Sequence, residues 1–591
     1  MHANHVLYST SGTMQLSRQS VSEAVGLIAL GATLIVGVPL FICMPLWVDT
    51  TYHDMSARNI LQGGLHYRDI FETNLPGMVW LHALVRPIVG WSSEAIRAVD
   101  FGVLSTIVWL LWVMLHRIGI SRCGRVWFAT GVMFFYLFET EFIHCQRDGW
   151  MLLPTVAAVV LRSRQMARPA VTSSATIYWR AVLEGMLWAC AVWIKPHAVV
   201  PGLFVLLAGS RRLAGISAHK SLVDFGGILT GGLIVGGVGT IWLILDGTWP
   251  FLWDVLLNWN PEYYRWTPTE MQIRLSGVIM YFAPWSLCHI AALPVALWAL
   301  ARARIWHYGE TPDMPAARND RALLAALYLG WLAEASLLQK NFHYAHAPVT
   351  LLAIAVLAAQ RWPVAQIVIG WCLLGGLLNA PAIAKRLPFL ASFEEVKPYT
   401  FRQVVPRHKL FDQPWRKVWW QCLTQGSSPE IKDRLSFYRQ IHCAPTWTEL
   451  DEVKEYLKTL DLKDGELVCW DDTTHPLYLD LNIRPGIRFM HVNTSLEFRS
   501  KRPVILQELQ QSGHKYVVSD LAVVNFLYGH FDTDPPEGKP LDLPVDFPCQ
   551  CADVYPWNQP IIKKCGRYWV HKIVNPVGPI RMPYPVKIDK P

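Results

Sequence analysis

Four carboxylates follow directly on the first long apolar run of the chain. The segment WVDTTYHDMSARNILQGGLHYRDIFETNLPG, residues 47–77, contains Asp49, Asp54, Asp69 and Glu72. Carboxylates can accept protons in general acid–base catalysis, but inserting one at the centre of a bilayer costs roughly 2.5–3.5 kcal/mol. The cost falls near the interface, so two interpretations of Asp49 stay open: it marks the end of a span, or it belongs to a functional site.

Four further polar groups interrupt the apolar first two thirds of the chain. Their sequences are FETEFIHCQRDGW (138–150), WIKPHAVVP (193–201), DGTWPFLWDVLLNWNPEYYRW (246–266) and QKNFHYAHAP (339–348). Asp148 breaks what would otherwise be a continuous apolar hairpin, and its alternative interpretation is an ion pair with a nearby Arg. For Lys195, Lys340 and the histidines the alternative is snorkelling to the membrane interface.

The composition is that of a polytopic membrane protein. Of the 591 residues 52% are hydrophobic and only 17% are charged, and long apolar stretches recur through the first two thirds. The formal net charge of +8 is spread over short segments between apolar runs instead of forming one basic stripe. This distribution favours membrane topology as its cause and argues against a nucleic-acid partner.

The apolar runs predict about eleven transmembrane helices, using about 17–25 residues as the length of a span. The predicted spans lie near 24–47, 98–116, 125–144, 149–162, 180–194, 197–210, 222–245, 276–301, 321–338, 346–360 and 363–381. The first run has no small-residue cleavage site after it, so we interpret it as a span and not as a cleaved signal peptide. The glycine-rich stretch at 226–239 lies within a span and follows no strand, which favours close helix packing over a phosphate loop.

The distribution of Lys and Arg predicts a cytoplasmic N-terminus. With that orientation the inner segments hold about sixteen of these residues and the outer connections about nine. The five polar groups then lie on the outer face, including a first outer loop at about 48–97. An odd number of spans also places the chain after about residue 385 outside.

The two parts of the chain are predicted to differ, with a transmembrane domain at 1–387 and an extracytoplasmic α/β domain at 388–591. In the second part TWTELDEVKEYLKTL (446–460) indicates an amphipathic helix with a Thr cap. GELVCW (465–470) and KYVVSD (515–520) indicate buried strands, with a helix in RPVILQELQQSG (502–513) between them. WDDTTH (470–475) is interpreted as a solvated turn.

Six of the twelve Cys residues lie in this second part. An oxidising outer compartment allows disulfides, and a bond from Cys549 or Cys551 to Cys565 is the best guess, although the connectivity cannot be read from the spacing. A CxC pair without a matching pair is weak evidence for zinc. The chain has no Walker, dinucleotide or GxSxG motif, so ATP-driven transport and hydrolase chemistry have no support.

The first loop resembles that of the GT-C class of membrane glycosyltransferases, in the branch of protein mannosyltransferases, the lipid A aminoarabinose transferase and their bacterial relatives. That pattern has an Asp after the first span, then Ala-Arg, Gly-Gly, Tyr-Arg-Asp and a PPG-like turn. It is matched in order by Asp49, Ala57-Arg58, Gly63-Gly64, Tyr67-Arg68-Asp69 and Pro76-Gly77. Two departures are Thr50, where Glu is usual, and NLPG, where two prolines are common. The QRDGW, WIKPH and QKNFHYAHAP segments resemble later family positions.

The resemblance implies transfer of a sugar from a polyprenyl-phosphate donor to an acceptor on the outer face, with inversion at the anomeric carbon. It suggests Asp49 as the general base and Asp148 as a second acid. The groups suggested to bind the lipid phosphate are Arg58, Arg68, Arg147, Lys195, His197, Lys340, His343 and His346. Those suggested to stack on sugar or lipid are Trp259, Tyr263, Tyr264 and Trp266. Some members of the class use a divalent metal, and no metal ligand is assigned here.

Two other functions remain open: a transporter or flippase of lipid-linked sugars, and a non-catalytic membrane scaffold. A flippase predicts mid-membrane charges or an inverted repeat, neither of which is clear in the sequence. The expected location is the inner (plasma) membrane of a bacterium. Within the first loop, Asp54 is interpreted as the polar face of an interfacial helix, and Asp69 as a residue that shapes the loop.

Overall fold

The computed structural model describes eleven stretches of the chain and separates it into two compact units. The described residues are 7–167, 172–214, 217–264, 268–305, 314–340, 342–378, 415–436, 444–495, 498–521, 555–574 and 577. Unit 1 comprises Met1–Ile42, Arg97–Gly239 and Trp266–Gly426, and unit 2 comprises Cys43–Ile96, Thr240–Arg265 and Ser427–Pro591. Each unit therefore combines segments that lie far apart in the sequence.

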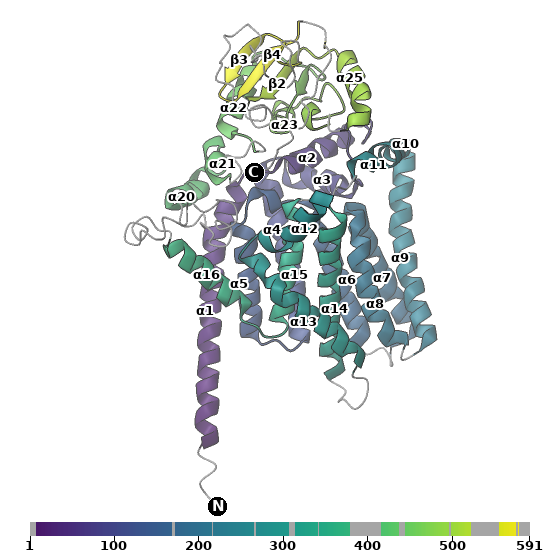
Figure 1. The fold of residues 1–591 in the computed structure, drawn as a ribbon, viewed down its shortest axis with the longest axis vertical. Helices are drawn as coiled ribbons and strands as arrows, with labels where there is room; N and C mark the ends of the chain where they lie inside the picture. Colours follow the sequence, from purple (N-terminus) through teal and green to yellow (C-terminus); the bar gives the residue numbers. More distant parts are fainter. Residues whose placement is uncertain are drawn as a thin grey trace, which may run out of the picture. The chain divides into compact units, whose positions relative to one another are not determined.

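Unit 1 is helical throughout its described part (Figure 1). The helices lying wholly or mostly in it are α1 (Leu7–Cys43), α4 (Ser93–Arg117), α5 (Arg122–Phe138), α6 (Arg147–Ala167), α7 (Ser174–Ile194), α8 (Val199–Ala214), α9 (Ala218–Leu245), α12 (Pro268–Met280), α13 (Cys288–Ile305), α14 (Met314–Ala333), α15 (Ala347–Ala358), α16 (Val364–Leu378) and α20 (Trp415–Gln425). Short turns of other helix types connect them: η1 (Glu141–Ile143), η2 (Pro196–Ala198), η4 (Trp285–Leu287), η5 (Glu334–Leu338) and η6 (His343–His346).

Six helices among the described residues are long and apolar enough to cross a membrane. They are Gln19–Cys43, Ser93–Arg117, Ser174–Ile194, Ala218–Leu245, Trp285–Ala303 and Ala316–Leu338, and four shorter apolar helices accompany them. Every predicted span coincides at least in part with a helix, but the count of eleven is not confirmed. The difference arises partly because several helices at predicted spans, such as Pro196–Gly209 and His343–Ala358, are shorter than a bilayer requires.

The glycine-rich helix α9 packs closely on α7, as the sequence predicts. A Cβ atom built on Gly227 would lie 2.6 Å from the backbone oxygen of Tyr178, and one on Gly231 would lie 2.0 Å from that of Val182. On the facing helix, a Cβ on Gly185 would lie 2.1 Å from the backbone oxygen of Ile228. Because no side chain fits in these gaps, glycine lets the two backbones approach.

Unit 2 surrounds a four-stranded sheet with short helices. Its strands are β1 (Leu467–Cys469), β2 (Tyr516–Asp520), β3 (Ile561–Cys565) and β4 (Tyr568–Lys572), in the order β1-β2-β4-β3. β1 and β2 are parallel, and the other pairs are antiparallel. Its helices are α2 (Val48–Leu61), α3 (Gly77–Val89), α10 (Trp249–Asp254), η3 (Val255–Trp259), α11 (Asn260–Tyr263), α21 (Pro429–Leu435), α22 (Trp447–Lys458), α23 (Pro476–Leu481), α24 (Val492–Ser495), η9 (Arg499–Lys501) and α25 (Arg502–Gln511). The predicted strands at 465–470 and 515–520 and the helix between them are confirmed.

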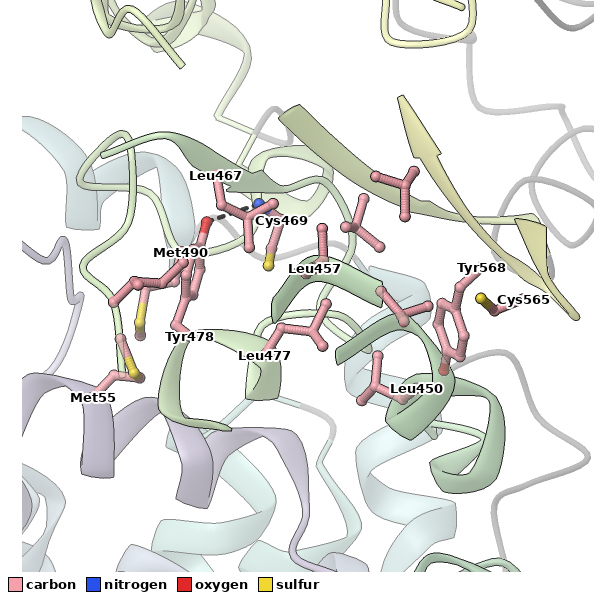
Figure 2. Packing of buried hydrophobic residues seen from close by; sticks show 14 of the residues in the cluster. Met55, Leu450, Leu457, Leu467, Cys469, Leu477, Tyr478, Met490, Cys565 and Tyr568 are labelled. Atoms are coloured by element: carbon pink, nitrogen blue, oxygen red, sulfur yellow. Dashed lines mark hydrogen bonds between the residues drawn. The ribbon is translucent and has the colours of Figure 1, made fainter. Parts of the chain in front are cut away.

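The core of unit 2 joins the first loop to the C-terminal sequence. Figure 2 shows Met55 of α2 near Met490 and Tyr478, and Ile70 of the same loop belongs to the same buried cluster. The hydroxyl of Tyr478 accepts a hydrogen bond of 2.7 Å from the backbone N–H of Cys469 in β1. The first loop is therefore part of this hydrophobic core, which the sequence does not predict.

Helix α22 begins where the sequence predicts, but a different residue caps it. The Thr446 side chain makes no cap hydrogen bond. The Asp433 carboxylate instead accepts bonds from the backbone N–H groups of Trp447 (2.7 Å) and Thr448 (3.2 Å). Glu449, which follows Thr446 by three residues and could have completed a capping box, accepts a bond from the N–H of Arg567. An ionised acceptor from another helix replaces the local cap.

The predicted disulfide partners Cys549 and Cys551 lie outside the described residues. Cys565, at the end of β3, is buried in the core of unit 2 beside Tyr568 (Figure 2).

Candidate functional site

Asp49 lies in the first turn of α2, the helix that opens the first loop. The N–H groups and the dipole of a helix N-terminus favour a negative charge, so this position suits an ionised carboxylate. The side chain is half-buried, while Val48 and Thr50 on either side are buried. Helix α2 therefore presents Asp49 as a partly accessible carboxylate on a fixed backbone.

Asp54 is not on a polar outer face, and that interpretation was wrong. The side chain is buried, and its Oδ1 atom lies 2.7 Å from Nδ1 of His82 and 2.6 Å from Nε of Arg86, both on α3. Burial raises the pKa of Asp54, but the bonds and charges of His82 and Arg86 outweigh it and hold the pKa below its usual value. Arg86 also donates to the backbone oxygens of Gly90 and Ser92. This ion pair joins α2 to α3.

Arg58 and Arg68, both suggested to bind phosphate, contact protein groups in unit 2. Nη1 of Arg58 donates to Oδ1 of Asn482 at 3.0 Å, and its guanidinium lies 5.0 Å from the ring centre of Trp91. Arg68 pairs with its neighbour Asp69, with Nε 2.6 Å from Oδ1. Asp69 also accepts a bond of 2.7 Å from the backbone N–H of Leu65. These contacts agree with a loop-shaping role for Asp69.

The prediction that the WDDTTH segment is a solvated turn is wrong. Asp471, Thr473, Thr474 and His475 are all buried. Asp471 accepts bonds from the N–H of Asp520 (2.8 Å) and the amide of Asn493 (3.0 Å), which hold the segment at the carboxyl ends of β1 and β2. Sequence reasoning missed the segment because its burial depends on partners from β2 and from residues near 493.

Asp472 in this segment is near enough to Asp49 for their charges to interact. Burial first, and then the negative charges of Asp520 and Asp49, raise the pKa of Asp472 to about 7. The folded protein binds a proton at Asp472 that the unfolded chain releases near pH 4.

This difference predicts a pH-dependent stability. Because folding raises the pKa of this acid, the free energy of unfolding decreases as pH rises from about 4 to about 7. Above about pH 7 this group causes no further decrease. Asp472→Asn removes this loss, so we expect it to stabilise the protein by about 1–2 kcal/mol at pH 8 and by little at pH 4.5, since solvent screens a half-buried side chain. Thermal unfolding of both proteins at the two pH values measures the effect. Equal differences at both pH values would contradict it.

In unit 1 three of the polar turns converge on Asp148. Nζ of Lys195 lies 2.8 Å from Oδ2 and 2.9 Å from Oδ1 of Asp148, in the first turn of α6. The amide nitrogen of Gln339 donates to Oδ1 of Asp148 at 2.9 Å. Gln339 also hydrogen-bonds to Lys195 through its oxygen and to Glu334 through its nitrogen. All four side chains are buried. The ion-pair interpretation of Asp148 is thus realised with Lys195 and not with an Arg.

The remaining candidates of unit 1 lie on the same turns. Arg147 precedes Asp148, and His197 lies in η2 directly after Lys195. The Lys195 ammonium lies 5.7 Å from the ring centre of Tyr344. Lys340 follows Gln339, and His343 and His346 lie in η6, with ring centres 3.9 Å and 5.3 Å from that of Tyr281.

Sequence reasoning missed Gln339, Glu334, Tyr281 and Tyr344. Gln339 and Tyr344 lie inside the QKNFHYAHAP segment, and attention to neutral polar and aromatic side chains there would have found them. Glu334 begins the π-helix η5, and a carboxylate within a predicted apolar span was the signal for it.

Two of the suggested stacking residues, Trp259 and Tyr263, belong to an aromatic cluster in unit 2. Trp259 is 2% exposed, and its ring centre lies 4.5 Å from that of Phe71. Tyr263 stacks on Phe498 at 6.0 Å. Tyr264 follows at the end of α11, and Trp266 lies outside the described residues. Trp259 therefore packs against other parts of unit 2.

The described residues contain no group of three or more His, Cys, Asp and Glu side chains that could hold a metal ion. Around Asp148 the arrangement does not fit a divalent metal, because the Lys195 ammonium contacts both carboxylate oxygens. A second positive charge at that place would be repelled. The predicted site residues thus form two groups, one around Asp49 in unit 2 and one around Asp148 in unit 1.

Solved structures are similar to this chain. ArnT from Cupriavidus metallidurans in the apo state matches with a TM-score of 0.51 and 14% identity, over 92% of this chain and 97% of that chain. ArnT bound to undecaprenyl phosphate gives 0.47 and 14%, over 94% and 99%. The archaeal oligosaccharyltransferase AglB from Archaeoglobus fulgidus, in complex with an inhibitory peptide and a dolichol-phosphate, gives 0.41 and 10%, over 85% and 70%.

No protein-family model matches the sequence, and no curated protein matches it. Similarity at 14% identity concerns the fold alone. Together with the six long apolar helices it makes the chain a multi-pass membrane protein. The chain has the fold of ArnT, an aminoarabinose transferase of the GT-C class, as the motif of its first loop predicts.

Proposed function

We propose that the chain is a membrane glycosyltransferase that moves a sugar from a polyprenyl-phosphate carrier to an acceptor on the extracytoplasmic face. Such a donor keeps its lipid in the bilayer and its sugar at headgroup level, so the reacting groups must lie at that interface. The fold of ArnT and the first-loop motif support this class of reaction.

The observation that carries the proposal is the buried network of Asp148, Lys195 and Gln339. Burying an ammonium and a carboxylate costs several kcal/mol per ion unless both are well paired. Ionisable groups kept among membrane helices are by default functional. Lys195 has the charge that a leaving phosphate requires, and Asp148 and Gln339 hold that ammonium in a fixed place.

In the proposed reaction, the acceptor hydroxyl attacks the anomeric carbon of the donor sugar. Its proton passes to the carboxylate of Asp49, and a new bond joins the acceptor oxygen to the anomeric carbon. The bond from the anomeric carbon to the phosphate oxygen breaks on the opposite side, which inverts the configuration. The polyprenyl phosphate leaves with the electron pair, and it needs positive charge instead of a general acid because it is a stable anion.

The other basic side chains of the polar turns are proposed to share this task. Arg147, His197, Lys340, His343 and His346 lie on the same turns as Asp148, Lys195 and Gln339. Arg58 and Arg68 are further candidates, and their guanidinium groups contact Asn482 and Asp69. We place the reaction at the outer face of a bacterial inner membrane, in keeping with the Lys and Arg distribution.

Lys195 provides the first test. We expect Lys195→Gln to lower kcat for sugar transfer by about 100-fold, because one charged donor to a developing anion is lost. Transfer of radiolabelled sugar from a panel of polyprenyl-phosphate sugars, in membranes containing the full chain, measures it. Lys195→Arg keeps the charge and should retain more activity than Lys195→Gln.

Lys458→Gln is the matched control, because Lys458 is a half-exposed lysine on α22 that pairs with Glu455. It should leave transfer unchanged. Transfer by Lys195→Gln at the wild-type rate would contradict the assigned role. A wild-type protein that moves the lipid across the membrane without forming a glycosylated product would instead identify a flippase.

A further inference from the structure

An unexplained cluster lies at the start of α2, around the WDDTTH segment. It consists of Tyr52, Asp472, His475 and His491, and we call it the α2 cluster. All four residues belong to unit 2, as does Asp49. The ring centre of Tyr52 lies 6.3 Å from that of His475 and 5.9 Å from that of His491. The two imidazole rings lie 5.7 Å apart.

A direct hydrogen bond ties the α2 cluster to the neighbour of Asp49. Nε2 of His475 lies 3.0 Å from the backbone oxygen of Val48, the residue before Asp49. A carbonyl only accepts, so Nε2 of His475 carries the proton and donates it. Tyr52 is three residues after Asp49 and therefore lies on the same face of α2. The cluster and the proposed base thus share one end of one helix.

His475 holds an unsatisfied acceptor at this place. The residue is 1% exposed, and among the described residues its Nδ1 atom has no hydrogen-bond partner. Burial lowers the pKa of His475 to about 3, so the ring is neutral and Nδ1 presents a lone pair. A buried acceptor left without a partner costs about 1–3 kcal/mol, which a ligand hydroxyl would recover.

The neighbours repeat the same chemistry and are accessible. Nδ1 of His491 likewise has no partner among the described residues, and burial lowers the pKa of that ring to about 4. Asp49, Tyr52, Asp472 and His491 are each half-buried, so part of each residue is accessible, and the rings of Tyr52 and His491 lie next to the buried His475. The segment is also pre-organised, since Asn493 donates its backbone N–H to the oxygen of Trp470.

We propose that the α2 cluster is a subsite that binds the hydroxyl groups of a neutral or amino-sugar acceptor beside Asp49. This inference rests on the proposed function, in which Asp49 removes a proton from the acceptor. The cluster offers carboxylates and neutral imidazoles, all of which accept hydrogen bonds, and a sugar ring supplies several neighbouring hydroxyl donors. The tyrosine ring can pack on the apolar face of that sugar.

Charge excludes one large class of acceptors. Asp49 and Asp472 lie near each other, and a uronic acid or a phosphorylated glycan would add a further negative charge there. An uncharged sugar avoids the repulsion, and an ammonium group on an amino sugar is attracted. The cluster therefore favours acceptors that are rich in hydroxyl groups and that carry no negative charge.

Two substitutions of His475 separate ligand binding from a structural role. In His475→Gln the side-chain amide can still donate to the oxygen of Val48, but the acceptor at Nδ1 is lost. In His475→Asn the side-chain oxygen replaces Nδ1, but the bond to Val48 is lost. A structural role predicts harm from Asn and not from Gln, while the proposal predicts the reverse.

The test uses the purified full chain and an array of short neutral, amino and uronic-acid oligosaccharides. We expect the wild type to bind neutral or amino members. His475→Gln should weaken that binding about 3- to 10-fold, and Asp472→Asn about tenfold or more, while His475→Asn stays near the wild type. Absence of glycan binding or a preference for uronic acids would overturn the proposal.

The same variants distinguish this inference from the proposed function. If transfer occurs and both His475→Gln and Asp472→Asn leave the acceptor KM unchanged, the glycosyltransferase stands and the subsite is wrong. If no lipid-linked donor supports transfer but glycan binding depends on His475, the subsite stands and the proposed reaction is wrong. Thermal unfolding of each variant confirms that a loss of binding is not a loss of fold.

Discussion

Asp49→Asn is expected to lower the rate of sugar transfer by about 100- to 10,000-fold, the range that a positioned general base contributes. The amide has nearly the shape of the carboxylate but cannot accept the proton of the acceptor hydroxyl. Because Asp49 is half-buried at the start of α2, the substitution should leave the fold intact. The measurement is transfer of radiolabelled sugar from polyprenyl carriers in membranes containing equal amounts of each protein.

Glu455→Gln is a suitable control for Asp49→Asn. Glu455 is an exposed carboxylate of α22 that pairs with Lys458, far in sequence from the first loop. It should transfer sugar at the wild-type rate. Normal transfer by a well-expressed Asp49→Asn protein would contradict the assignment of Asp49 as the general base. It would also contradict the catalytic role proposed for the first-loop motif.

Arg86→Met is expected to cost about 3–5 kcal/mol of stability, because it leaves the buried carboxylate of Asp54 without its main counter-charge. Both side chains are at most 1% exposed, so solvent cannot replace the lost partner. The substitution also frees the backbone oxygens of Gly90 and Ser92. Thermal unfolding and protease resistance of the purified protein measure the loss.

Two variants control for the Arg86 prediction. Arg68→Met removes an exposed ion pair with Asp69, and we expect it to cost less than about 1 kcal/mol. Asp54→Leu combined with Arg86→Met removes both buried charges and should recover much of the stability, since apolar replacements of a buried pair are often neutral. If Arg86→Met and Arg68→Met prove equally mild, the ion pair does not hold α2 to α3.

The elements of this protein were largely predictable because their causes are local. A helix in a membrane satisfies all of its own backbone hydrogen bonds, so long apolar runs sufficed to find α1, α4, α7 and α9. Short apolar runs likewise located β1 and β2, and the helix predicted between them is α25. Close helix packing at the glycines of α9 followed from residue size alone, and the structure identifies α7 as the partner. The number of spans was less certain, since several apolar runs are shorter than a bilayer.

The environment of individual side chains was not predictable in the same way. Asp54 and the WDDTTH segment both look solvated in sequence, yet each is buried by partners well separated in the chain. Asp54 meets Arg86 on α3, and His475 meets the backbone of Val48 in the first loop. The cap of α22 also came from Asp433 and not from the local Thr446.

Residue types and their spacing were enough to predict a membrane protein, the positions of its polar turns and the first-loop motif that contains Asp49. These features depend only on residues that are close together in the sequence. The contacts of Lys195 and Gln339 with Asp148, and the packing of His475 beside α2, could be identified only in the folded structure. The burial and pairing of a charged side chain depend on residues that are far away in the sequence, and residue spacing does not show which of them come together.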